Sequence, residues 1–373
     1  MMTHCEERDR RTRLAALGAR LAAMGVAEAT TYAVPDYLDP EHQRRLQRAG
    51  GESPGREDCE GEDEHEDDEA ASAEAAAGDD RPRVCEPWRE RICEWCYGVV
   101  DHFDLDRGLV ALALSFLDRY LAVRAVDRRL FQLAALTSLY LATKLHHGSK
   151  IRLDSFVELS RGHFSAAHLE VMEGALLHGL GWRCHPPTAR DFVRELLPLV
   201  PGNVPPRVRC AAGELAAFLT ELAVCDYWFV ARARPSSIAL AALRNALELH
   251  DVKARERDAF LGRAAEGLLG SAGAAAGAGA AASDDPEVAA CHARLREIYV
   301  AGEYSPDLGL LDASGRSSAA SPDGVEDGPA AEAATAAARA ATSRAGVSPD
   351  NVLDGPDAAE DPAVDARSDM DCP

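Results

Sequence analysis

The sequence predicts an all-α protein made of two consecutive five-helix units, together with a disordered acidic linker and a disordered acidic C-terminal tail. Apolar residues recur three and four positions apart over most of residues 83–300, and no stretch shows the alternation that a β-strand requires. Acidic residues are concentrated elsewhere. Residues 50–80 contain 14 of them against one basic residue, and residues 301–373 contain 15 against four.

These two acidic segments account for the negative charge of the chain. The formal net charge is −22, so the remaining residues are close to neutral. Segments of such high charge and low hydrophobicity cannot bury enough apolar surface to fold. A near-neutral folded part does not favour nucleic-acid binding. No apolar run has membrane length, no signal peptide is recognisable, and the ten cysteines are scattered, so we expect no membrane association and a reduced compartment, the nucleus and/or the cytoplasm.

The regions outside the predicted units have distinct compositions. Residues 1–49 form an N-terminal extension with a short helical pattern, followed by a segment at 32–38 that is typical of a docking strip. Residues 50–82 are the acidic linker, and residues 301–373 are the tail. The tail contains three Ser-Pro pairs that are either ordinary composition or sites for a proline-directed kinase. The sequence leaves both readings open for Ser305, Ser321 and Ser348.

Residues 83–184 are predicted to form the first unit. Asp106 can cap a helix with apolar positions from Leu109 to Leu121, and Asp127 can cap the next, over 128–145. That helix is apolar or small on nearly every side, so it should lie at the centre of a bundle. Ser165 begins another helix, which Gly181 ends.

Residues 185–300 are predicted to form the second unit, which begins after the proline pair at 186–187. Thr188 can cap its first helix. An Ala/Gly tract at 270–283 interrupts the pattern and is expected to be a flexible insertion. The helices are expected near residues 188–197, 205–225, 235–250, 254–269 and 286–300.

One cysteine pair has the spacing of a metal or redox motif. Cys93 and Cys96 form a C-x-x-C, but it lies inside a helical pattern and no second such pair exists. We therefore expect two small buried positions, and neither a metal nor a cofactor.

Several motifs follow one another in the order of a cyclin box. They are Trp88-Arg-Glu-Arg-Ile-Cys-Glu-Trp95, Ser115-Phe-Leu-Asp-Arg-Tyr-Leu121, Leu130-Phe-Gln-Leu133, Leu141-Ala-Thr-Lys144, Met172-Glu173 and Leu180-Gly-Trp182. The sequence thus resembles the cyclin family, strongly over the first unit and by helical pattern over the second, and looks nearest to the cyclins of diatoms and related algae. The five positions that define the family hold the expected residues: Arg89, Asp118, Leu133, Lys144 and Glu173.

The resemblance implies a cyclin-like fold and a regulatory subunit that is not an enzyme. Such a subunit binds a cyclin-dependent serine/threonine kinase as a heterodimer and activates it in cell-cycle control. The resemblance also implies that Arg89 and Asp118 form a structural ion pair and that Leu133 belongs to the core. A carboxylate at position 118, on a helix face of small residues, is costly unless it is paired, although a solvated surface aspartate is the simpler reading.

The kinase-binding residues implied by the resemblance are Lys144 and Glu173. They would lie side by side and hydrogen-bond the backbone of the kinase near its mobile regulatory helix. Taken alone, Lys144 could simply extend its ammonium to water at the end of an apolar helix. Glu173 alone could be an ordinary surface charge.

A second site, for substrate docking peptides, is implied at positions on the first and third helices. Trp88 stands where the family usually has methionine, and Arg91 replaces an apolar residue. A charge inside the patch should weaken apolar docking, so we expect an altered site, and the sequence leaves open whether it binds such peptides. The matching residues are Trp88, Arg91, Ile92, Trp95, Arg128 and Gln132.

Other classes of function fit less well. The chain has no H-E-x-x-H, Gly-rich phosphate loop or nucleophile elbow that would indicate an enzyme. A general transcription factor of the same fold should have a zinc ribbon and a basic surface, and neither is present. The alternatives that remain are a cyclin partner of a transcriptional kinase and a cyclin-fold scaffold that activates no kinase.

Overall fold

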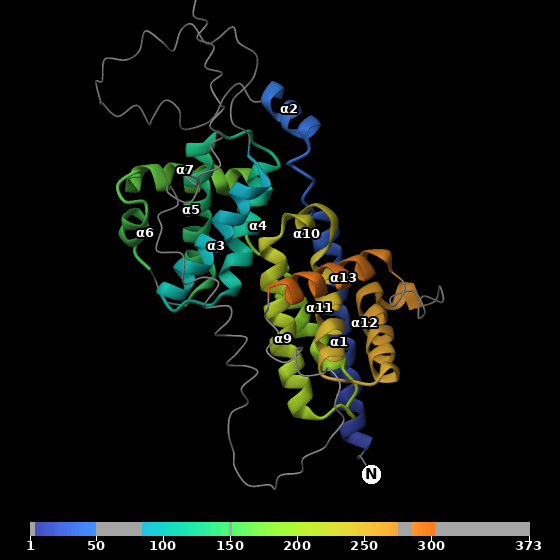
Figure 1. The fold of residues 1–373 in the computed structure, drawn as a ribbon. Helices are drawn as coiled ribbons and strands as arrows, with labels where there is room; N and C mark the ends of the chain where they lie inside the picture. The colour runs from blue at the N-terminus through green and yellow to red at the C-terminus, as the bar shows by residue number, and fades with distance from the viewer. Residues whose placement is uncertain (1–3, 50–83, 149–150, 275–284, 303–373) are drawn as a thin grey trace, which may run out of the picture.

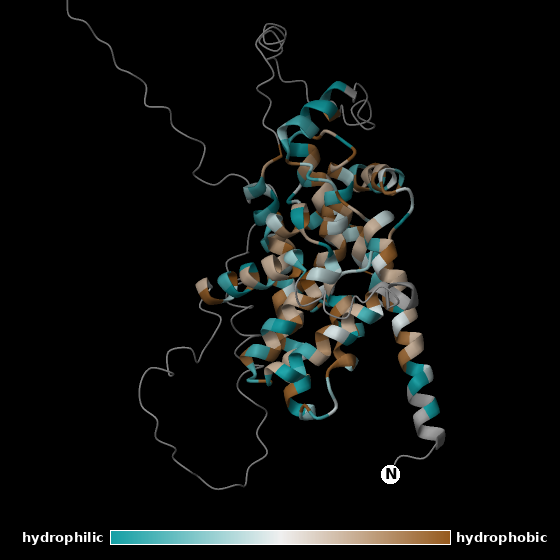
Figure 2. Ribbon diagram, turned by 90° about the vertical axis from the view of Figure 1, so that its right-hand side faces the viewer, coloured by the Kyte–Doolittle hydropathy of each residue, from teal (hydrophilic) through white to brown (hydrophobic). Residues whose placement is uncertain are grey.

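The computed structural model describes residues 4–49, 84–148, 151–274 and 285–302. These residues are helical, with no strand among them, which confirms the predicted all-α class. Two helices precede the predicted first unit. They are α1 (His4–Thr30) and α2 (Pro40–Ala49), the latter coloured mostly as hydrophilic at the top of Figure 2.

Helices α3 to α7 surround one hydrophobic core. Helix α5 packs against α4, α6 and α7, and its side chains from Phe131 to Ser138 are all buried, so the most apolar helix does lie at the centre. The helices are α3 (Glu86–His102), α4 (Gly108–Leu121), α5 (Arg128–His146), α6 (Leu153–Leu159) and α7 (Ala166–Gly179) (Figure 1).

Helices α8 to α13 surround a second core, centred on α11. Helix α11 packs against α8, α9, α12 and α13. The one-and-a-half-turn helix α10 was not predicted from the sequence. The elements are α8 (Ala189–Leu196), a 3₁₀ turn (Leu197–Leu199), α9 (Pro206–Cys225), α10 (Tyr227–Arg232), α11 (Pro235–Leu249), α12 (Ala254–Ala274) and α13 (Pro286–Ala301).

The helix starts follow the capping residues that the sequence offers. Asp127 accepts a hydrogen bond from the amide of Leu130 at 2.8 Å, and Thr188 accepts one from the amide of Asp191 at 3.2 Å. Ser165 forms a capping box at the start of α7. Asp106 accepts from the amide of Gly108 at 2.8 Å, so α4 begins two residues after it.

The Ala/Gly tract differs from expectation at its start. Helix α12 continues to Ala274, five residues beyond the predicted end. The rest of the tract, at 275–283, lies outside the described residues, as do the predicted disordered linker and nearly all of the predicted tail.

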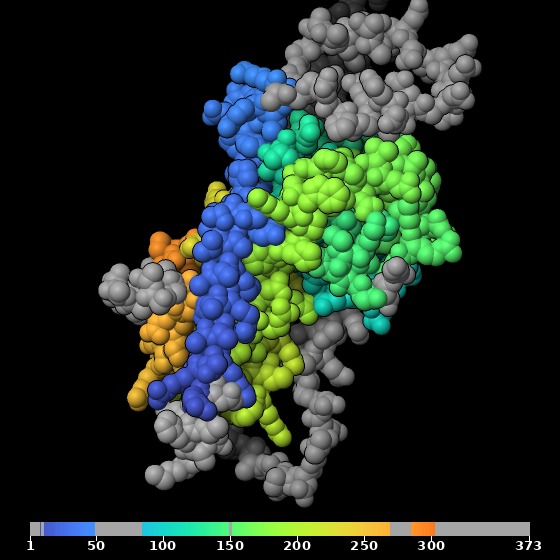
Figure 3. All heavy atoms as spheres, turned by 180° about the vertical axis from the view of Figure 1, so that it is seen from behind, coloured from blue at the N-terminus to red at the C-terminus, as the bar shows by residue number. Residues whose placement is uncertain are grey.

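The N-terminal extension contacts both cores. Figure 3 shows α1 lying along the second unit beside α12, and Leu17 and Leu21 are buried there. The loop after α1 then carries Tyr37 into the first core, where the side chain is buried. The strip at 32–38 therefore docks within the same chain.

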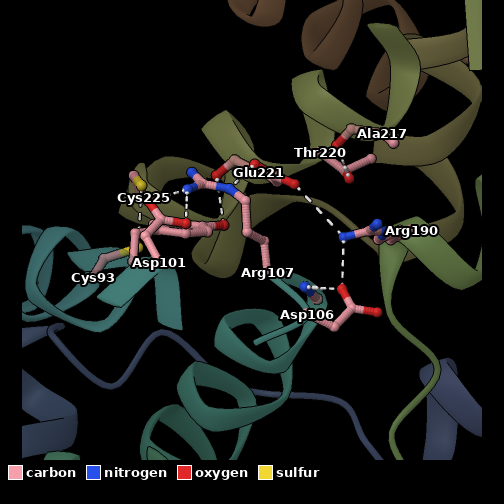
Figure 4. A network of polar contacts seen from close by, with 11 residues as sticks. Cys93, Asp101, Asp106, Arg107, Arg190, Ala217, Thr220, Glu221 and Cys225 are labelled. Atoms are coloured by element: carbon pink, nitrogen blue, oxygen red, sulfur yellow. Dashed lines mark hydrogen bonds and ion pairs between the residues drawn. The ribbon is translucent and has the colours of Figure 1, made fainter. Parts of the chain in front are cut away.

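Polar contacts join the two units where α3 and α4 meet α8 and α9 (Figure 4). Arg107 donates to both carboxylate oxygens of Asp101 at 2.6 Å and to Glu221 of α9 at 2.8 Å. Arg190 lies between Asp106, at 3.1 Å, and Glu221, at 3.6 Å. Each unit thus supplies charges that the other neutralises.

Candidate functional site

Lys144 and Glu173, far apart in the sequence, form an ion pair on the surface of the first unit. Lys144 lies in the last turn of α5 and Glu173 in the middle of α7, and these helices pack together. The Lys144 Nζ is 2.7 Å from the Glu173 Oε1, with side chains 48% and 16% exposed. The hydrogen bond from Lys144 to Glu173 raises the pKa of the lysine, so the ammonium stays charged at neutral pH.

The pair is positioned by rigid neighbours. The Lys144 Nζ lies 5.5 Å from the centroid of the Tyr140 ring, a cation–π contact, and Tyr140 packs edge-on against the buried Phe156. A cation in the last turn of α5 also complements the negative end of the helix dipole. The ammonium is therefore held in place while about half of the side chain remains accessible.

Two exposed apolar residues at the ends of α5 and α7 were not identified from the sequence as site residues. Leu145 follows Lys144 directly, and Trp182, which is 67% exposed, comes shortly after α7. Trp182 also has a positive φ of 62°, which is unusual for a bulky residue, and its amide donates to Leu177 at 2.9 Å. The motif Leu180-Gly-Trp182 includes this tryptophan, but the motif does not predict that the residue is exposed to solvent.

Two histidines lie beside the same end of α5. The rings of His146 and His185 are 4.8 Å apart, and the Nε2 of His146 is 2.8 Å from the carbonyl oxygen of Cys184. These contacts attach the chain after α7 to the end of α5, close to Lys144 in the sequence.

Arg89 and Asp118 form a bidentate ion pair inside the protein. The Nε and Nη2 atoms of Arg89 donate to the two carboxylate oxygens of Asp118 at 2.8 and 2.9 Å, and both side chains are buried. Tyr37 donates to the same carboxylate at 2.8 Å, while Arg89 donates to the carbonyl of Val224 at 2.8 Å. The reading of Asp118 as a solvated surface residue is thus wrong. Leu133, the fifth family position, is buried in the first core.

The six positions of the expected docking patch are not assembled into one exposed surface. Ile92 and Trp95 are 0% and 2% exposed because α3 turns them into the first core. The prediction is therefore wrong for these two residues. Gln132 is buried as well, and Trp88 is half-buried against Phe131, with ring centroids 5.8 Å apart. The remaining two residues, Arg91 and Arg128, are partly exposed, and each interacts with another group of the protein.

Other expected features have the following positions. Ser305, Ser321 and Ser348 lie outside the described residues. Within the described residues, no group of three His, Cys, Asp or Glu side chains could hold a metal ion, and no helix is long and apolar enough to cross a membrane. Cys93 and Cys96 are both buried.

Residues 63–185 match the family model of the cyclin N-terminal domain. The chain contains a cyclin N-terminal domain, the cyclin box. The matched residues include all five helices of the first unit. The paired Lys144 and Glu173 thus lie on the surface of the cyclin box.

Curated relatives that match the chain include two cyclins. The chain is 28% identical over 154 residues to cyclin-A2-1 of Oryza sativa subsp. japonica, covering 41% of this chain and 31% of that protein. It is 29% identical over 160 residues to G2/mitotic-specific cyclin-B2 of Oryzias latipes, covering 43% and 40%. The match therefore spans less than half the length of these relatives.

A solved structure of a viral cyclin from herpesvirus saimiri is a distant neighbour. It has a TM-score of 0.43 and 18% identity, and the similarity covers 59% of this chain and 90% of the viral chain.

Proposed function

We propose that this chain is a cyclin that binds a cyclin-dependent serine/threonine kinase as a heterodimer and activates it in cell-cycle control. The observation that carries this proposal is the 2.7 Å pair of Lys144 and Glu173 on the exposed edge of the cyclin box. A lysine ammonium has three donors and a carboxylate has several acceptor sites. Each partner therefore retains capacity to bond the carbonyls and amides of a second protein.

The activation mechanism requires no catalytic residue in the cyclin. A protein kinase is active when its strand lysine pairs with the glutamate of its regulatory helix and its metal-binding aspartate is aligned. A partner that binds only the inward position of that helix shifts the population toward the active state. Helices α5 and α7 supply a rigid surface for this purpose, because both are anchored in the core on their inner sides.

Charge reversal at the pair tests the proposal. We expect Lys144→Glu and Glu173→Lys each to abolish capture and activation of the kinase, since losing one partner of a desolvated charged contact costs roughly 2–5 kcal/mol. The measurement is affinity capture from extract, mass spectrometry of the bound kinase, and phosphorylation of a substrate by the complex. Lys253→Glu is the matched control, because Lys253 is an exposed lysine in the second unit.

The double variant Lys144→Glu/Glu173→Lys separates binding from folding. It restores an internal ion pair with the charges exchanged, so helicity should equal that of the unmodified chain. Its donors and acceptors are then exchanged relative to the kinase, and we expect no capture. If both single variants capture and activate the kinase as well as Lys253→Glu does, the interface lies elsewhere.

A further inference from the structure

Two thiols meet across the joint between the units. The Sγ atoms of Cys93, on α3, and Cys225, at the end of α9, are 3.1 Å apart, and Figure 4 shows them facing each other. The residues are 132 positions apart in the chain, so no sequence motif indicated the pair. The C-x-x-C motif of the sequence is a different pair, because it joins Cys93 with Cys96, one turn further along α3.

The surroundings keep the two sulfur atoms in register. The residue before Cys225 accepts a hydrogen bond from Arg89 through its carbonyl at 2.8 Å, and Arg89 is itself held by the buried Asp118. One turn further along α3, Tyr97 donates to the carbonyl of Glu221 at 3.3 Å. Helix α3 is therefore fixed to the last turn of α9 on both sides of the thiol pair.

The two thiols differ in accessibility. Cys93 is completely buried, while Cys225 is partly exposed. Of the two residues, Cys225 is therefore the one that a small oxidant can approach from solvent. Cys93 needs no contact with solvent, because its only target is a sulfur atom already next to it. Burial raises the pKa of the Cys93 thiol, which agrees with Cys225 reacting first.

We propose that Cys93 and Cys225 are a reversible redox modification site at which hydrogen peroxide forms a disulfide between α3 and α9. The thiolate sulfur of Cys225 attacks one peroxide oxygen, the O–O bond breaks, and the leaving hydroxide takes a proton to become water. Cys93 then attacks the sulfenic sulfur of Cys225, the S–O bond breaks, and a second water leaves with the proton of Cys93. Two thiols are oxidised, one peroxide is reduced to two waters, and a thiol reductant reverses the change.

The disulfide would join the two units covalently. It closes a loop of more than a hundred residues, and cross-links across long loops restrict the unfolded chain most. We expect the oxidised protein to melt several degrees higher than the reduced one. The Lys144–Glu173 pair lies on other helices, so this inference is independent of the proposed function and can fail or hold without it.

The test uses the full chain, with and without peroxide, followed by alkylation of remaining thiols and trypsin digestion. Cleavage after Arg91, Arg107, Arg209 and Arg232 gives one peptide with Cys93 and Cys96 and another with Cys210 and Cys225. We expect these peptides to be linked after oxidation, to separate with dithiothreitol, and to be lighter by two hydrogen atoms when linked. The rise in melting temperature should be reversed by the same reductant.

Variants assign the link. Cys96→Ser/Cys210→Ser is the matched control and should keep both the linked peptides and the melting shift. Cys93→Ser and Cys225→Ser should each lose both. The proposal is overturned if the native chain gives no linked peptides at a peroxide concentration that oxidises the exposed Cys210. It is also overturned if the link persists in Cys93→Ser and maps to Cys96. If Cys93→Ser fails to fold, the presence or absence of linked peptides in the native chain and in Cys96→Ser/Cys210→Ser still decides the question.

Discussion

Asp118 accepts hydrogen bonds from two buried donors, the guanidinium of Arg89 and the hydroxyl of Tyr37. In Asp118→Ala both lose their acceptor, and Arg89 becomes an uncompensated charge inside the protein. We expect the free energy of unfolding to fall by about 3–5 kcal/mol. Urea denaturation followed by circular dichroism measures this. Asp154→Ala, which breaks an exposed pair with Arg152, should cost about 1 kcal/mol or less. Equal losses in the two variants would contradict the assigned role of Asp118.

Glu28 of α1 is a buried carboxylate that accepts from the amide of Ser236 at 2.9 Å and from the Ser236 hydroxyl. Burial raises the pKa of Glu28 above its ordinary value, although the hydrogen bonds from Ser236 lower it in part. The folded state therefore binds a proton more tightly than the unfolded state does. The contribution of this group to stability accordingly increases as the pH falls toward the raised pKa, and decreases as the pH rises.

Glu28→Gln removes that proton uptake. We expect the difference in unfolding free energy, native chain minus variant, to shift in favour of the native chain as the pH falls from neutrality through the raised pKa of Glu28. Urea titrations of both proteins at each pH give the difference directly. Other titrating groups are common to both proteins and cancel. A difference that does not change with pH would show that Glu28 titrates with its ordinary pKa.

At the scale of elements, α1 is attached to the second unit through a narrow set of side chains. Leu21 is 0% exposed where α1 packs against the second unit, whereas Val26 on the same helix is 64% exposed. We expect Leu21→Ala to lower the free energy of unfolding by about 2–5 kcal/mol. Val26→Ala, a truncation on the outer face, should change it by about 0.5 kcal/mol or less. Chemical denaturation of both variants checks the contrast, and similar losses would mean that α1 is not anchored through Leu21.

Two of the predicted helices carry a capping residue followed by apolar spacing. Asp127 and Thr188 begin α5 and α8, and the spacing runs along each helix from there. Helix α10 also has a capping residue, Asp226, but its six residues are too few to establish an apolar period. The docking of Tyr37 against Asp118 was also not predictable, since the partner lies 81 residues away and only the fold brings the two together.

For the candidate site, the sequence predicted which residues pair with each other, but it did not predict which side chains are buried. The order of motifs predicted that Lys144 and Glu173 lie together, and the distance between their charged atoms agrees. Burial was harder to predict, because the side chains of Ile92 and Trp95 suit a docking surface and a hydrophobic core equally well. Which of the two they serve depends on the direction in which α3 faces its neighbours, and this is decided by contacts with distant segments.

At the scale of the whole molecule, the two cores are joined by contacts that belong to neither. Arg107 at the start of α4 bonds Asp101 of its own unit and Glu221 of the other, and its guanidinium lies 4.4 Å from the centroid of the Tyr97 ring. Contacts of this kind make the opening of one unit expose charges of the other. We therefore expect the native chain to unfold in a single transition.

Arg107→Ala should weaken that coupling more than it weakens either core. We expect a loss of roughly 1.5–3 kcal/mol, because Glu221 and Asp101 lose a charged donor. Hydrogen exchange of amides in α5 and α11, the central helices of the two units, measures the free energy of opening of each. The two values should agree in the native chain and separate in the variant. Arg194→Ala, which breaks an exposed pair within α8, should leave them equal. If α5 and α11 remain equal in Arg107→Ala while both values fall, the arginine stabilises the molecule without coupling its halves. The coupling then comes from other contacts between the units, such as those of Arg89 and Tyr97 with α9.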